Sequence, residues 1–247
     1  MHRWILALTV LAVAGPTRAE LPALLQDALQ KQHAEAGHWA YTETSVTRDK
    51  RGRVQKETVV RHDPSLPYAE QSRLLKINGR EPTKLEARRH REAAEKNRNT
   101  KRVTLDDMAD LDHVTVAEET PTSVTYDIPL RNIEGARFPA NQADRFRVTI
   151  TVNRERRVLE HVAVQLRQPL YRGPLKLSAL ALDLTFATVD PKYGPVLVGG
   201  RGTGTGGILF LKTDISNERT CTDFQHVTPY DERFGVKIGK VKVLDFW

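Results

Sequence analysis

The sequence predicts a mainly antiparallel α+β fold: a curved, incomplete β-barrel of about 10–11 strands, with an N-terminal helix and inserted helices covering the concave face. Three observations predict it. A helical apolar pattern opens the chain just after residue 20, alternating apolar and polar residues fill most of the rest, and turn residues separate the alternating segments. We expect residues 20–247 to form a single domain, a size that β-sandwiches and barrels reach.

Residues 1–19 have the three-part layout of a secretory signal peptide. A short basic start precedes an apolar run over residues 4–14, and small residues follow around Ala19. The apolar run is shorter than the roughly 20 residues that a spanning helix needs. We therefore expect export to a periplasm. Since no cysteine stands near the predicted cut, we expect a soluble protein without a lipid anchor or a transmembrane segment.

Three segments have helical patterns. The first has apolar residues spaced along one helical face and ends before Gly37; they are Leu21, Leu24, Leu25, Ala28 and Leu29. The second opens on a capping box formed by Thr83 and Glu86 and is very polar, so it should lie largely in water. The third is a short helix over residues 105–111.

The alternating segments are candidate strands, and turn residues separate most of them. They cover residues 39–47, 54–61, 74–77, 114–118, 123–130, 146–153, 158–166, 177–189, 206–213, 220–226 and 236–244. The glycine-rich stretch 199–207 lacks the Gly-Lys-Ser/Thr of a phosphate loop, and a strand pattern follows it rather than a helix. We expect it to form a flexible hairpin loop or a glycine-bent corner of the sheet.

The composition constrains the partners. Hydrophobic residues make up 39% and charged residues 28%, typical of a folded core with a charged surface. The formal net charge is +7, lowered by two when the predicted signal peptide is removed. In an exported protein this charge favours anionic lipid head groups or acidic envelope components over nucleic acid, although simple solubility explains it equally well. Arg88, Arg89 and Arg91 are the candidates for contact with an anionic surface.

Catalytic chemistry has little support in the sequence. Asp106, Asp107 and Asp110 could meet on one helical face and hold a metal, but a short solvated helix explains them better. The single cysteine, Cys221, permits no internal disulfide and reads as a strand residue rather than a nucleophile. Motifs of hydrolases and metalloproteases are missing. We therefore expect a non-enzymatic protein without a metal or cofactor.

Large apolar residues on alternating strand positions are the candidates for lining a cavity. They are Trp39, Tyr41, Leu75, Ile77, Tyr126, Ile128, Phe146, Val148, Ile150, Leu182, Leu184, Phe186, Ile208 and Phe210. An apolar sheet face of this extent needs a cover, and two short helices supply only part of one. An open surface that accepts lipid tails and a fully packed core both fit this pattern.

In architecture, the chain resembles the periplasmic lipoprotein-carrier superfamily that includes LolA, LolB and RseB. The features that carry the resemblance are the signal peptide, the N-terminal helix, the Trp39-Ala40-Tyr41 strand, the segment Leu74 to Gly79, the helical insertion and the run of strands. The resemblance implies an incomplete barrel with a helical lid over a hydrophobic cavity. It also implies binding of a lipid or an acylated protein without catalysis.

Three functional hypotheses follow. The first is a lipid- or lipoprotein-binding carrier. The second is an RseB-like sensor or interaction module that binds another envelope protein through a sheet edge or the Arg-rich helix. The third and weakest is a metal-assisted enzyme at Asp106, Asp107 and Asp110.

Overall fold

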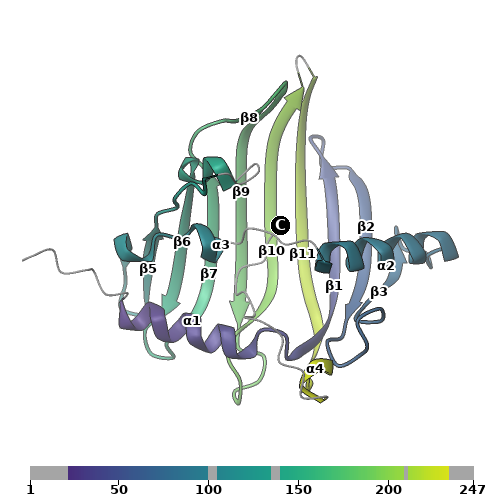
Figure 1. Ribbon diagram of the computed structural model, residues 1–247, viewed down its shortest axis with the longest axis horizontal. Helices are drawn as coiled ribbons and strands as arrows, with labels where there is room; N and C mark the ends of the chain where they lie inside the picture. Colours follow the sequence, from purple (N-terminus) through teal and green to yellow (C-terminus); the bar gives the residue numbers. More distant parts are fainter. Residues whose placement is uncertain (1–21, 100–104, 135–139, 209–210, 234–247) are drawn as a thin grey trace, which may run out of the picture.

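The computed structural model describes residues 22–99, 105–134, 140–208 and 211–233, and in this part of the chain eleven strands form one antiparallel sheet (Figure 1). The strands are β1 Trp39–Asp49, β2 Val54–His62, β3 Ser72–Ile77, β4 Thr115–Glu119, β5 Ser123–Ile128, β6 Phe146–Asn153, β7 Val158–Leu166, β8 Leu170–Arg172, β9 Leu175–Ala187, β10 Val196–Ile208 and β11 Leu211–His226. The helices are α1 Ala23–Glu35, α2 Lys84–Asn99, α3 Leu105–Met108 and α4 Tyr230–Arg233, with short 3-10 helices at Leu111–His113 and Ala140–Arg145.

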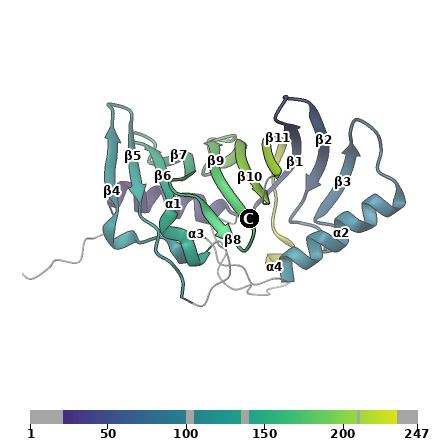
Figure 2. The same cartoon turned by 90° about the horizontal axis from the view of Figure 1, so that it is seen from above.

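The order of the strands joins the beginning and the end of the described chain. It runs β3-β2-β1-β11-β10-β9-β7-β6-β5-β4, and β8 pairs with β9. In the described residues β3 and β4 are the two edges, and they lie at opposite ends of the curved sheet (Figure 2). The sheet is therefore open, and the predicted class, a mainly antiparallel, incompletely closed barrel with an N-terminal helix, is confirmed.

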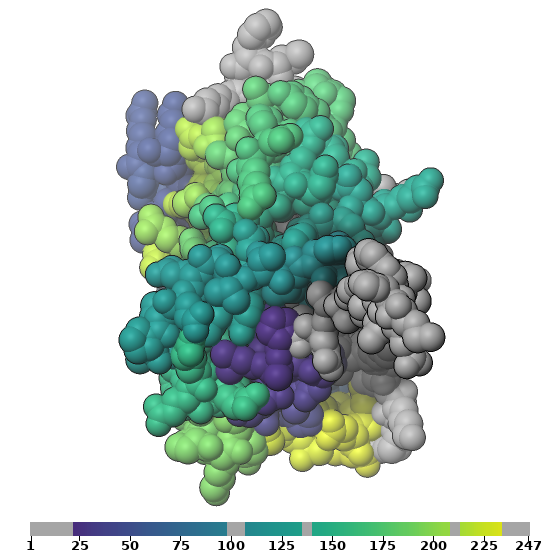
Figure 3. Space-filling model, turned by 90° about the vertical axis from the view of Figure 1, so that its left-hand side faces the viewer, coloured from purple at the N-terminus to yellow at the C-terminus, as the bar shows by residue number. Residues whose placement is uncertain are grey.

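Helix α1 covers one half of the sheet by packing on β7 and β6 (Figure 1). Two polar contacts fix it to the β6–β7 turn: Arg157 Nη2 lies 2.7 Å from Asp27 Oδ2, and Lys31 Nζ donates to the Arg156 carbonyl at 2.8 Å. The helix ends at Glu35, and Gly37 two residues later has a φ of +88°, a left-handed conformation that glycine adopts without strain. When the left-hand side of Figure 1 faces the viewer, α1 (purple) is flanked by teal and green segments from later in the chain (Figure 3).

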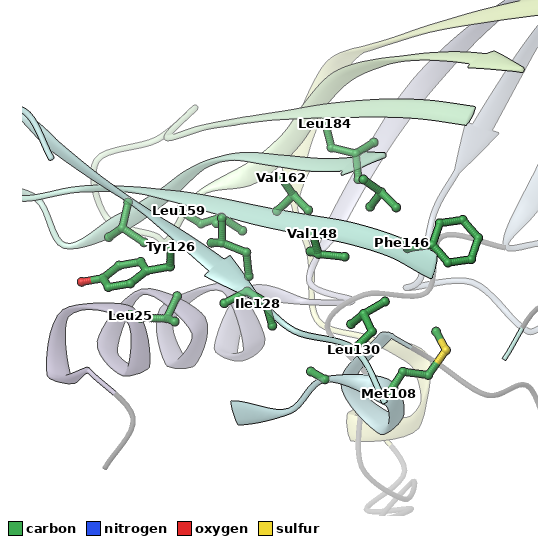
Figure 4. Packing of buried hydrophobic residues seen from close by; sticks show 14 of the residues in the cluster. Leu25, Met108, Tyr126, Ile128, Leu130, Phe146, Val148, Leu159, Val162 and Leu184 are labelled. Carbon is green, nitrogen blue, oxygen red and sulfur yellow. The ribbon is translucent and has the colours of Figure 1, made fainter. Parts of the chain in front are cut away.

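The hydrophobic core lies between α1 and the strands that it covers. Leu25 points from α1 toward Ile128 and Leu159 of the sheet, and all three are fully buried (Figure 4). Met108 of α3 and Leu130 close the same core from the side. Burying one such side chain stabilises the fold by about 1.5–3 kcal/mol, so this half of the sheet holds α1 in place.

The inner face, defined as the face that carries α1, changes from apolar to polar across the sheet. Register shows this along one row of paired residues: Leu184 of β9, Gly200 of β10, Arg219 of β11, Ser45 of β1 and Thr58 of β2. On β10, four glycines follow on this face at every second position; they are Gly200, Gly202, Gly204 and Gly206. A strip of bare backbone therefore separates the apolar half from the polar half.

Helix α2 lies on the inner face over β3, at the opposite end of the sheet from α1 (Figures 1 and 2). The predicted capping box is confirmed: the Thr83 N–H donates to Glu86 Oε2 at 2.8 Å, and the Glu86 N–H donates to Thr83 Oγ1 at 3.3 Å. His90 contacts β3 through Ser72, with Nε2 2.9 Å from Oγ. Only one side of this polar helix meets the sheet.

The edge strand β4 is short and charged. Its five residues are all exposed, a register shift interrupts its pairing with β5, and Glu119 pairs with Arg154. No helix among the described residues is long and apolar enough to cross a bilayer.

Several expectations from the sequence need correction or fall outside the description. The glycine-rich stretch 199–207 is neither a loop nor a corner but the body of β10, and the strands expected at 206–213 and 220–226 are parts of the β10–β11 hairpin. The expected helix 105–111 stops at Met108, because Ala109 forms a β-bridge with Leu130. The signal peptide and the strand expected at 236–244 lie outside the described residues.

Two glycines of β10 provide a matched test of how tightly β9 and β10 pack. A Cβ on Gly200 would lie 2.8 Å from Leu184 Cδ2 and 2.9 Å from the Asp183 carbonyl oxygen, and a backbone oxygen cannot move aside cheaply. We expect Gly200→Ala to lower the free energy of unfolding by about 1–3 kcal/mol in urea denaturation. At Gly202 the nearest atom would be 3.7 Å away. Gly202→Ala should therefore be neutral or slightly stabilising, by up to about 1 kcal/mol; equal losses in both variants would contradict this account.

Candidate functional site

A cavity of about 420 Å³ lies between the end of α1, the β2–β3 loop and α2. The first residues of β1 and β10 and the last residues of β11 also border it. Its lining residues are Gln32, Glu35, Ala36, Gly37, Trp39, Tyr41, His62, Asp63, Pro64, Tyr68, Gln71, Ser72, Ala94, Glu95, Val196, Leu197 and Phe224. The volume falls within the roughly 300–1,000 Å³ that small-ligand sites occupy. This cavity is the strongest candidate site in the described part of the chain.

Aromatic side chains from β1 and β11 form one wall of the cavity. Trp39 and Tyr41 both lie on the inner face of β1, and Phe224 of β11 contacts both of them. The centroid of the Phe224 ring is 6.2 Å from that of the Trp39 ring, edge to face, and 5.9 Å from that of the Tyr41 ring, stacked. His62 of β2 stacks on the other side of Tyr41 at 4.9 Å. Such ring pairs hold each other in fixed orientations, so the wall is formed before any ligand arrives.

Glu35 connects the end of α1 to this wall. The Trp39 Nε1–H donates to Glu35 Oε2 at 3.2 Å, and His226 Nε2 lies 3.4 Å from the same oxygen. The His226 ring also stacks on Tyr193 at 3.7 Å, and Tyr193 meets the Trp39 ring edge to face. The carboxylate therefore fixes both the indole and the helix end that border the cavity.

The opposite wall is polar and comes from the β2–β3 loop and α2. Asp63 Oδ1 accepts from the N–H and the hydroxyl of Ser65, at 3.0 and 2.6 Å, which shapes the loop. Tyr68 donates from its hydroxyl to the buried Asp231, and the Tyr230 N–H donates to the Pro64 carbonyl at 2.8 Å. Helix α4 therefore supports this loop from behind.

A group of charged and titratable residues lies on the inner face beside the cavity. Glu43 Oε1 is 3.4 Å from Arg219 Nε, and Glu43 Oε2 is 3.7 Å from His62 Nε2, which is too long for a hydrogen bond. Burial, together with the nearby charges of His90, Arg219 and Arg61, lowers the pKa of His62 to about 4. At neutral pH His62 therefore presents an uncharged ring to the cavity.

Cys221 lies next to this group and is buried. Burial, with a smaller contribution from the nearby Glu43 carboxylate, raises the pKa of its thiol to about 11. The thiol is therefore protonated at neutral pH, and only the thiolate is a nucleophile.

The structure places the cavity candidates from the sequence in three settings. Trp39 and Tyr41 line the cavity. Seven others are buried in the hydrophobic core: Tyr126, Ile128, Phe146, Val148, Ile150, Leu184 and Phe186. Leu182 packs partly buried against that core. Leu75 and Ile77 are partly buried on β3, where Leu74 is the buried residue, and the side chains of Ile208 and Phe210 lie outside the description.

The arginine candidates border a second hollow, of about 760 Å³, between α2 and β3. Arg88 and Arg91 line it, and Arg89 is exposed elsewhere on the helix. The other lining residues are Arg73, Leu74, Lys84, Leu85 and Ala87. This hollow is apolar at its base and carries four cationic side chains.

The aspartates proposed as metal ligands form no described site. No group of three or more His, Cys, Asp or Glu residues in the described part of the chain could hold a metal ion. Asp110 instead lies 2.9 Å from His113 Nδ1 through its Oδ2, and this contact raises the pKa of His113. The side chain of Asp106 falls outside the description.

Sequence reasoning missed most of the cavity wall. Phe224, Val196 and Leu197 were not among the candidates, although Phe224 stands in an alternating strand pattern that could have indicated it. Gln32 and Glu35 were not among the candidates either. Their part in the cavity follows from where α1 ends, which the pattern of that segment does not indicate.

No protein-family model matches the chain, and no curated protein matches it. Among solved structures, a LolA superfamily protein from Nitrosomonas europaea is similar, with 11% identity, a TM-score of 0.41 and coverage of 87% of this chain and 96% of that one. MucB in complex with MucA has 10% identity and a TM-score of 0.22, covering 83% and 99%. The Pseudomonas aeruginosa MucA/MucB complex has 9% identity and a TM-score of 0.20, covering 82% and 99%. One of these neighbours is thus a member of the superfamily that the sequence resembles.

The lowered pKa of His62 makes the stability depend on pH. The unfolded chain takes up a proton at His62 near pH 6.5, whereas the folded protein does so only near pH 4. His62 therefore contributes a loss of unfolding free energy as the pH falls through this window, of about 1–2 kcal/mol once solvent screening of the partly exposed ring is included. His62→Phe keeps a ring stacked on Tyr41 and removes the titration.

We expect urea denaturation between pH 7.5 and pH 4 to show a shallower acid-side loss for His62→Phe than for the original chain. His113→Gln is the control, because the pKa of His113 is raised and its removal cannot flatten that loss. A His62→Phe curve parallel to the original would show that the ring is not shielded as described.

Proposed function

We propose that this chain is a non-catalytic binding protein of the cell envelope that takes the apolar part of a lipid-like amphiphile into the cavity beside Trp39. The observation that carries the proposal is the cavity itself, a preformed hollow with an aromatic and aliphatic wall on one side and a polar wall on the other. A ligand with one apolar end and one polar end fits this division. Each buried methylene would contribute about 0.8 kcal/mol to binding.

The size of the cavity favours a small amphiphile. A volume of about 420 Å³ is near the lower end of the range for small-ligand sites. The apolar half of the inner face offers no further room in the described residues, because α1 is packed onto it and its large side chains are buried. We therefore place the bound chain next to that core rather than within it, with Leu197 lying between the two.

Location and domain organisation belong to the same proposal. The pattern of residues 1–19 supports export and removal of that segment. The continuous sheet from β3 to β4 supports one domain over residues 20–247. A binding protein of this kind would then act in the periplasm.

A second candidate function is docking of another envelope protein at the hollow between α2 and β3. Arg73, Lys84, Arg88 and Arg91 surround Leu74 and Leu85 there, and an acidic segment with apolar side chains would complement both features. Charge reversal at Arg91 should weaken capture of such a partner from envelope extracts, while leaving uptake of amphiphiles in the other cavity unchanged.

Filling the cavity tests the proposed function. Ala94 lines it from α2, and its neighbour Ala93 is exposed on the same helix. We expect Ala94→Phe to weaken binding of a fluorescent fatty-chain probe at least about tenfold, because the ring occupies the space of two or more methylenes. Ala93→Phe adds the same ring outside the cavity and should bind as the original protein does.

Native mass spectrometry of protein purified without detergent is the second readout. We expect an added mass in the original chain and in Ala93→Phe, and its loss in Ala94→Phe. A clean unliganded mass together with no uptake of the probe by the original chain would overturn the proposed function.

A further inference from the structure

We infer that the cavity selects amphiphiles whose polar end is a cationic ammonium group, in preference to neutral or anionic amphiphiles of the same chain length. This inference rests on the proposed function and names the class of ligand for the same site.

The charge of the cavity is opposite to that of the chain. Three carboxylates line it, Glu35 of α1, Asp63 of the β2–β3 loop and Glu95 of α2, and no lysine or arginine does so among the described lining residues. The chain as a whole carries a formal charge of +7. A negative hollow in a basic protein therefore repels a carboxylate or phosphate head group and attracts an ammonium.

The one basic side chain on the lining does not offset these carboxylates. His62 has a pKa of about 4 because it is buried and faces Arg219, Arg61 and His90, so it adds no positive charge at neutral pH. The nearby Arg219 is not among the lining residues, and its Nε lies 3.4 Å from Glu43 Oε1.

A buried acceptor in the lining has no donor. Gln32 is 92% buried, lines the cavity beside Glu35, and its Oε1 accepts no hydrogen bond. A buried unsatisfied oxygen costs about 1–3 kcal/mol. The ligand that removes this cost is a hydrogen-bond donor, and an ammonium group has donors and no acceptor.

The aromatic wall adds a second attraction for a cation. Trp39, Tyr41 and Phe224 border the same space as the carboxylates, and the negative faces of aromatic rings attract ammonium groups. The apolar end of the ligand would lie against Val196 and Leu197 at the start of β10. Its ammonium would then lie among the polar lining groups, with Gln32 and Glu35 on the α1 side and Asp63 and Glu95 on the side of the loop and α2.

The test compares three ligands with twelve carbons each, dodecylamine, dodecanol and dodecanoate, at pH 7 and at concentrations below the limit at which each one aggregates or separates from water. At this pH the amine is cationic and the acid anionic. We expect the amine to bind about tenfold more tightly than the alcohol, and the acid more weakly than the alcohol, by calorimetry or probe displacement. Added salt should reduce the advantage of the amine, since partly exposed charges are screened.

Two variants locate the selectivity. Glu95→Gln removes an exposed carboxylate from the cavity rim and should reduce the ratio of amine to alcohol affinity about threefold, chiefly by weakening the amine. Glu92→Gln removes the same charge from the same helix outside the cavity, where Glu92 pairs with Arg88, and should leave the ratio unchanged. Thermal melting confirms that both variants are folded.

The outcomes separate the two proposals. If all three ligands bind and the alcohol or the acid equals the amine, the inference is wrong and the proposed function stands. The inference is also wrong, and the proposed function still stands, if Glu92→Gln changes the ratio as much as Glu95→Gln. The preference for the amine would then come from the overall charge of the helix and not from the cavity. If none of the three binds to the full-length protein, the proposed function fails and takes the inference with it.

Discussion

The pairing of β1 with β11 is the constraint on which the rest of this structure depends. It runs from Trp39 opposite His226 to Asp49 opposite Ile215 and joins the first described strand to the last. Without this pairing, β1, β2 and β3 would form a separate small sheet. Such an isolated sheet is only marginally stable in water. The same pairing brings Trp39 and Tyr41 next to Phe224, so the wall of the cavity forms as the sheet forms.

The position of the cavity follows from the change in polarity across the inner face. On the apolar side, α1 removes large side chains from water and leaves no room for a ligand among the described residues. On the polar side, Asn217 donates to Ser45 and Thr47 at 3.0 and 3.2 Å, a surface that apolar groups would not cover favourably. The cavity lies where these surfaces meet the ends of two helices, and its two walls carry that difference in polarity into the site.

The sequence predicted the local elements well because their signals are local. The capping box at Thr83, the strand opened by Trp39 and the helix before Gly37 each depend on residues within a few positions. The glycine-rich strand β10 was read as a loop because glycine has low β-propensity by itself. Its neighbours decide otherwise: Leu184 of β9 lies across the bare backbone of Gly200, a contact between segments that periodicity cannot show.

The candidate site was predictable only in part, for the same reason. Alternation shows that one face of a strand is buried, and it placed Tyr126, Ile128 and Val148 correctly on such a face. It does not show whether a helix or a ligand covers that face. Trp39 and Tyr41 show the same alternating pattern as those core residues, but they line the cavity. The difference comes from the strand that pairs with them and from the helix ends that lie over them.

The edge strand β4 bears on how this protein behaves at high concentration. An open sheet has unpaired backbone groups at its edges, which can pair with another copy and begin an aggregate. At β4 the edge is five residues long, ends in Glu118 and Glu119, and has an irregular register next to Val116. Short length, like charges and irregular register each oppose the addition of a further strand there. At this edge an incomplete barrel can therefore stay open without becoming a template for fibrils.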